Sequence, residues 1–147
     1  MNKRPAGVSI IAFIYILISG VGLYSSLSMG MSNWFTFATM VLFGLAGIGF
    51  YMGQKWAWWV ISTFVLISIT SNSLKLIVAL NQVGLESAIQ KTYLLMAAKV
   101  VVQSLILILM FSKPVIDFVK LENFTKPKLF LYLLAATVGM FLLLYIF

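Results

Sequence analysis

The stretch from Lys55 to Lys75, K-WAWWVISTFVLISITSNSL-K, decides the fold, because two lysines bracket nineteen residues that carry no charge. Twenty helical steps of about 1.5 Å span about 30 Å, the thickness of the hydrocarbon core of a bilayer. Three tryptophans follow Lys55 closely, at Trp56, Trp58 and Trp59. Tryptophan is enriched where membrane and water meet, so these side chains are expected to form an interfacial belt. The stretch therefore predicts a transmembrane helix over about 56–75.

Composition places the rest of the chain in lipid as well. Of the 147 residues, 63% are hydrophobic and only 9% are charged, which is far from the balance of a soluble domain. Cysteine and histidine are both absent, and this removes disulfides, thiolate and imidazole chemistry and the commonest ligands of transition metals and haem. We therefore expect a protein of the cell (inner or plasma) membrane, with no cofactor and no metal.

Further uncharged runs predict an all-α fold, a polytopic membrane bundle of about five transmembrane helices in a single domain, 1–147. The expected spans are about 6–25, 34–53, 56–75, 93–111 and 129–147. The segments 76–91 and 113–128 alternate apolar with polar residues and are expected at the membrane interface. For 76–91 the alternative is an extension of the preceding helix that ends near Gly84.

The distribution of cations predicts the orientation of this bundle. With the N-terminus in the cytoplasm and the C-terminus outside, Lys75 and Lys91 face outward and seven cations face inward. The seven are Lys3, Arg4, Lys55, Lys113, Lys120, Lys126 and Lys128. The positive-inside rule favours this arrangement. It also accounts for the net charge of +7, so no nucleic-acid partner is expected.

Small residues four apart indicate two helix-packing faces. Gly49 and Gly53 have G-x-x-x-G spacing in the second span, and Ala135 and Gly139 repeat a small-xxx-small spacing in the fifth. Such faces let helix backbones approach closely in lipid. The alternative is that glycine is simply commoner in membrane helices.

A polar cluster is predicted where the third and fourth spans pair. Asn72 and Lys75 are three residues apart and Lys99 and Gln103 are four apart, so each pair shares a helix face. Lys99 is expected about 9 Å inside the membrane, counting helical steps from Tyr93. Two lysines and two amides suit an anion or a lipid headgroup. The alternative is that Lys75 anchors at the interface and Lys99 snorkels outward.

An enzymatic reading needs Ser71 and Lys75 as nucleophile and base, since no histidine, cysteine or embedded acid is present. This spacing arises often by chance. We therefore expect no enzyme.

Three stretches carry a resemblance to a known group of proteins: Arg4-Pro5 followed by Gly7-Val8, Lys55-Trp56-Ala57-Trp58, and Ser112-Lys113-Pro114-Val115. Over residues 4 to 120 the chain resembles the small, largely uncharacterised four-helix membrane proteins of bacteria and archaea. The resemblance implies a four-helix membrane fold and no catalytic residues. The predicted fifth span departs from that pattern.

These observations favour a non-catalytic integral membrane protein that packs in the lipid bilayer as a homo-oligomer or as an accessory subunit with other membrane proteins. The alternative is a small channel or transporter for an anionic or neutral solute, with the polar cluster lining its path.

Overall fold

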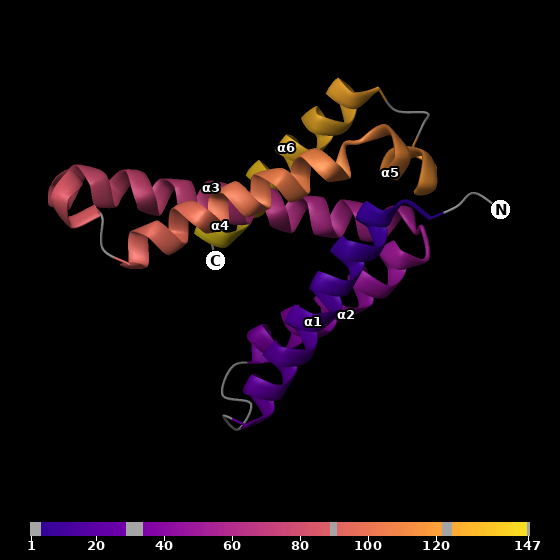
Figure 1. Cartoon of the computed structure of the whole chain (residues 1–147), viewed down its shortest axis with the longest axis horizontal. Coiled ribbons are helices and arrows are strands. Elements are labelled where there is room, and N and C mark those ends of the chain that lie inside the picture. The colour runs from indigo at the N-terminus through magenta and orange to yellow at the C-terminus, as the bar shows by residue number, and fades with distance from the viewer. Residues whose placement is uncertain (1–3, 29–33, 89–90, 122–124, 147) are drawn as a thin grey trace. The chain divides into compact units, whose positions relative to one another are not determined.

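The computed structural model describes residues 4–28, 34–88, 91–121 and 125–146, with side chains described at these positions except 80–88, 91–92 and 140–146 (Figure 1). The described residues form helices and no strands, which confirms the all-α class. The helices are α1 (Ala6–Ser28), α2 (Trp34–Tyr51), α3 (Lys55–Ala88), α4 (Lys91–Met110), α5 (Lys113–Phe118) and α6 (Lys126–Ile146).

Four helical segments of the described chain are long and apolar enough to cross a membrane: Ala6–Ser28, Trp34–Tyr51, Lys55–Ala79 and Tyr93–Met110. They coincide with the first four predicted spans. The fifth predicted span, 129–147, falls on α6, but the side chains of its second half lie outside the described residues. That span and the predicted orientation therefore stay predictions.

The chain forms two compact units whose boundary lies inside α3. Unit 1 comprises Met1–Ile61 and Met110–Lys126, and unit 2 comprises Ser62–Leu109 and Pro127–Phe147.

In unit 1, α1 and α2 form an antiparallel hairpin (Figure 1), and glycines of α2 lie against α1. A Cβ on Gly47 would stand 3.1 Å from the carbonyl oxygen of Ala12, and one on Gly44 would stand 2.6 Å from Ser19 Oγ. Ser19 is buried and its hydroxyl donates to the Met40 carbonyl at 2.8 Å. The two backbones approach this closely because Gly44 and Gly47 have no side chains.

The structure corrects the place of Gly53. α2 ends at Tyr51, and Gly53 follows in the left-handed region with φ +76°. Its N–H donates to the Phe50 carbonyl at 3.0 Å, and the N–H of Gln54 donates to the Gly49 carbonyl at 2.9 Å. This is a Schellman cap, which favours glycine at that position because a Cβ strains the left-handed conformation. Gly49 and Gly53 therefore do not form one helix face, and Gly49 instead lies against Trp56 and Ala57.

Trp58 also differs from its expected place in an interfacial belt. Its indole is fully buried and donates from Nε1 to the carbonyl of Met110 at 3.0 Å. Met110 is the last residue of α4, where carbonyl groups lack partners within the helix. The indole also meets the Phe111 ring edge-to-face at 5.3 Å between centroids. Trp58 is thus a core residue that joins the start of α3 to the end of α4, whereas Trp56 is exposed.

The segment predicted as interfacial over 113–128 contains the short helix α5 and a second Schellman cap. Lys120 takes the left-handed conformation with φ 57°, and the N–H of Leu121 donates to the Ile116 carbonyl at 3.0 Å. The apolar residues of this segment are buried in the protein: Val115, Ile116, Val119 and Leu121. The apolar side of this segment therefore packs against protein, and its position at the membrane interface stays a prediction.

In unit 2, α3 continues without interruption past Lys75 to Ala88. The alternative that this segment extends the third helix therefore holds, but the helix runs to Ala88 and does not end near Gly84. At about 1.5 Å per residue, a helix of 34 residues is about 50 Å long, which exceeds the hydrocarbon core.

Candidate functional site

Two of the four polar side chains that were predicted to meet between the third and fourth spans, Asn72 and Gln103, meet through a serine, Ser68. Gln103 on α4 donates from Nε2 to Ser68 Oγ at 2.7 Å. Asn72, one turn further along α3, donates from Nδ2 to the Ser68 carbonyl at 2.9 Å and to Ser68 Oγ at 3.3 Å. All three residues lie in unit 2 and inside candidate membrane spans. Asn72 and Gln103 are therefore part of one hydrogen-bonded network across the α3–α4 interface.

Sequence reasoning missed Ser68, although a signal was present. Ser68 precedes Asn72 by four residues, so the two share a face of α3. Serine is small and common in membrane helices, where it usually bonds to its own backbone, as Ser104 does with the Val100 carbonyl at 2.8 Å. Ser68 differs from a serine that bonds to its own backbone because Gln103 lies opposite it on α4.

The network leaves one polar atom unsatisfied. Gln103 Oε1 is buried and has no hydrogen-bond partner among the described residues. Within a bilayer no bulk water is at hand to replace a missing partner, and a buried acceptor left unpaired costs about 1–3 kcal/mol. The site therefore has one unused acceptor, which suits a donor such as water or a hydroxyl or amide group of a neutral solute.

The structure does not bring the two lysines into this network. Lys75 and Lys99 both have exposed side chains on α3 and α4, and neither donates to Ser68, Asn72 or Gln103 in the bonds that the described side chains make. An exposed lysine in a span can extend its stem to bring the ammonium group to the headgroups. The predicted anion site of two lysines and two amides is therefore divided: the amides are joined and the cations are separate.

Neither catalytic chemistry nor metal binding gains a constellation from the described residues. Ser71 has Lys75 one turn away, but Lys75 is exposed, and no bond between them is among those of the described side chains. No group of three or more histidine, cysteine, aspartate or glutamate side chains within the described part of the chain could hold a metal ion.

The predicted packing face on α6 is uncovered. Ala135 is exposed, and a Cβ built on Gly139 meets no atom within 4 Å. Thr137, between them in sequence, is buried and donates to the Leu133 carbonyl at 2.8 Å. Buried and exposed residues thus lie on different sides of α6, and the described chain leaves room for a side chain at Gly139.

No protein-family model, curated protein or solved structure matches this chain.

Proposed function

We propose that the chain is a non-catalytic, multi-pass protein of the cell membrane that acts as a homo-oligomer or as an accessory subunit of a larger membrane complex. The observation that carries the proposal is the coverage of the span Tyr93–Met110. Only 6% of it is buried inside the structure, against 28% for Ala6–Ser28. Large apolar side chains of α4, among them Leu94, Val101 and Ile108, are exposed and thus available to lipid or to another protein.

Apolar exposure alone does not select a protein partner, because lipid tails are as apolar as leucine. Small residues on an exposed face do favour a second helix, since they let its backbone approach and gain dispersion contacts. The uncovered Ala135 and Gly139 provide such a face on α6. The proposal therefore combines a helix with an exposed apolar face and a second helix that has a surface suited to close packing.

The test is the mass of the particle after gentle detergent extraction, compared between Gly139→Leu and Gly20→Leu. Neither site has an atom within 4 Å of an added Cβ, so both variants are expected to fold. A bulky side chain in a close interface costs about 1–3 kcal/mol, which weakens association about 5- to 150-fold. We expect the parent and Gly20→Leu to remain associated and Gly139→Leu to dissociate. Monomers in all three samples would contradict the proposal.

The proposed orientation, with the N-terminus in the cytoplasm, has a clean test because the chain contains no cysteine. Single cysteines would replace Ser87 and Lys113, and intact cells would be treated with a membrane-impermeant thiol reagent. The positive-inside rule predicts labelling at 87 and protection at 113. The reverse pattern would overturn the orientation and leave the association test unaffected.

A solute pathway is the second candidate, and the unpaired Gln103 Oε1 favours it. Polar groups inside a membrane span often mark the path of a substrate or an ion. A cysteine at Lys99 that reacts with an impermeant reagent, in a protein that also admits solute into liposomes, would support this candidate. Inert liposomes and an unlabelled cysteine would exclude it.

A further inference from the structure

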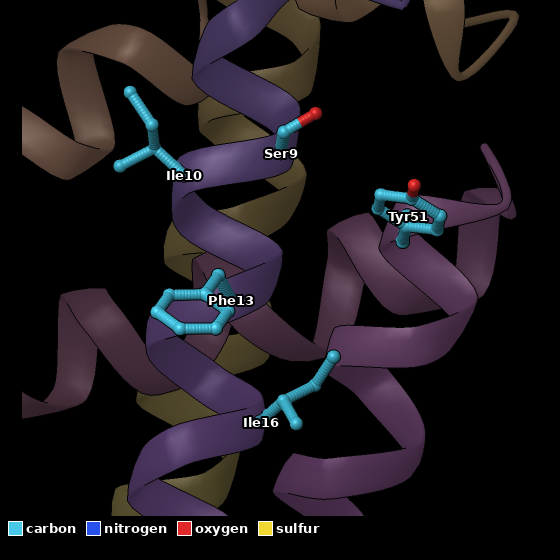
Figure 2. A pocket seen from close by; sticks show the side chains of 5 residues that line it. All are labelled: Ser9, Ile10, Phe13, Ile16 and Tyr51. Atoms are coloured by element: carbon cyan, nitrogen blue, oxygen red, sulfur yellow. The ribbon is translucent and has the colours of Figure 1, made fainter.

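An open groove lies in unit 1, between the first turns of α1 and the end of α2 (Figure 2). It has a volume of about 490 Å³ and is lined by Ser9, Ile10, Phe13, Ile16 and Tyr51. Figure 2 shows the hydroxyl groups of Ser9 and Tyr51 towards one end, with Phe13 and Ile16 further along α1. The two hydroxyl groups therefore lie near the start of α1, where Ile10 also lines the groove, and the lining further along α1 is apolar.

A cation lies at the end of this groove that holds the two hydroxyl groups. The guanidinium carbon of Arg4 is 3.5 Å from the ring centroid of Tyr51, and Tyr51 is a lining residue. The aromatic ring holds the guanidinium by a cation–π interaction. Because Arg4 is exposed, its N–H donors remain available to an anion. Arginine presents these donors as a planar fork that matches phosphate oxygens.

The surrounding end of unit 1 is basic. Arg4 meets the end of α2, Gly53 lies close to Phe118 of α5, and Trp58 of α3 bonds to the end of α4. These contacts gather the starts of α1, α3 and α5 at one end of the unit, with exposed Arg4, Lys55 and Lys113. Among the described residues of unit 1, Asp117 is the one acidic side chain. The field at this end therefore attracts anions.

We propose that the groove binds one anionic glycerophospholipid, with its phosphate on Arg4 and an acyl chain along Ile10, Phe13 and Ile16. The apolar residues suit the chain, and the hydroxyls of Ser9 and Tyr51 suit the ester and phosphate oxygens between chain and headgroup. The volume falls within the range of sites that hold small molecules. An apolar helix from a second copy would fill the groove but leave the Arg4 donors without an anion, so charge complementarity favours the lipid.

The proposal does not depend on the association argued above, because its residues belong to unit 1 and the α6 face belongs to unit 2. Basic pockets at membrane helices recognise anionic headgroups in general. What is specific here is a pairing of one arginine with one acyl-sized groove.

The test is a titration of the purified full chain with phosphatidylglycerol and with phosphatidylcholine of identical acyl chains, with bound lipid counted by native mass measurement. One cation near a headgroup changes lipid affinity by about fivefold. We expect phosphatidylglycerol to bind at least about fivefold more tightly to the parent, and Arg4→Gln to lose this preference. Lys113→Gln removes the same charge from the same end of unit 1 outside the groove and is expected to keep the preference.

A second pair of variants tests the acyl groove. Ser9→Trp fills it and is expected to abolish binding of both lipids, whereas Val21→Trp adds the same bulk to an exposed site of α1 outside the lining residues. Equal affinity of the parent for the two lipids would overturn the proposal. An equal loss of the preference for phosphatidylglycerol in Arg4→Gln and Lys113→Gln would also overturn it. Displacement of the bound lipid by free glycerol phosphate would do the same, and so would a Ser9→Trp variant that loses self-association but keeps the lipid.

Discussion

Replacing Gln103 by leucine is predicted to stabilise the protein if the interface between α3 and α4 is dry. The substitution removes one hydrogen bond between the helices, from Gln103 Nε2 to Ser68 Oγ at 2.7 Å. Measured bonds of this kind in membrane proteins average about 0.6 kcal/mol. Ser68 Oγ is not left alone, because Asn72 Nδ2 also lies within bonding distance at 3.3 Å.

The same substitution removes a cost. Gln103 Oε1 is buried without a partner among the described residues, and an unpaired buried acceptor destabilises the folded state by about 1–3 kcal/mol. Leucine also has a volume close to that of glutamine, so no large cavity follows. Setting the lost bond against the relieved acceptor gives a net stabilisation of roughly 0.5–2 kcal/mol.

The assay is reversible unfolding of the purified chain in mixed micelles, from which the free energy of unfolding of each variant is compared with the parent. Ser104→Ala is the matched control, because the neighbouring hydroxyl bonds to the backbone of its own helix at 2.8 Å, and its removal is expected to change the stability by under about 0.5 kcal/mol. A destabilisation of about 1 kcal/mol or more by Gln103→Leu would refute the reasoning. It would mean that the amide contributes more to the folded state than its one bond to Ser68, as it would if Oε1 had a partner such as water.

Three further substitutions and one control test the packing of unit 1 by the same unfolding assay. Trp58→Phe leaves the Met110 carbonyl without the indole donor now at 3.0 Å and is expected to cost about 1–3 kcal/mol; no change would mean that another group takes over the carbonyl. Gly47→Ala brings a Cβ within 3.1 Å of the Ala12 carbonyl oxygen and is expected to cost about 1–3 kcal/mol, whereas Gly20→Ala, which meets nothing within 4 Å, should not destabilise. Lys120→Gly relieves a left-handed residue at φ 57° and is expected to stabilise by about 1 kcal/mol; a loss of stability would show that the lysine side chain makes a compensating contact.

The positions of the first four spans could be predicted because charge is excluded from the hydrocarbon core, so uncharged runs of the right length mark the helices. The end of α3 could not be predicted in this way. Lys75 resembles the edge of a span, yet a lysine on a continuous helix can reach the headgroups through its own stem. A charge therefore limits the depth of its ammonium group without ending the helix. The helix continues to Ala88, and the pattern of charges does not determine where its backbone hydrogen bonds end.

The contacts between helices could not be predicted, because the sequence does not show which helix lies against each face. Trp56 and Trp58 are the same residue type and both follow Lys55 within three residues. Two steps along a helix turn them to different faces, and Trp58 is the one that bonds to the end of α4. Gly53 likewise fits a G-x-x-x-G pattern while serving as a cap. In each case the residue type was informative, and the face that it occupies depended on where a second helix lies.

The separation of amides from cations bears on which function the chain performs. A path for an anion needs positive charge beside its polar lining, but Asn72 and Gln103 bond within the α3–α4 interface while Lys75 and Lys99 have exposed side chains. A path for a neutral solute needs only amides, and here most of their donors are already used on Ser68. Lys99 instead lies on the span that the chain covers least, where an ammonium group in contact with lipid tails is costly. That cost is avoided if the stem of Lys99 carries the ammonium group to the headgroups or if a partner helix supplies an acceptor. Neither arrangement needs a conducting path, so the exposed lysine does not favour conduction.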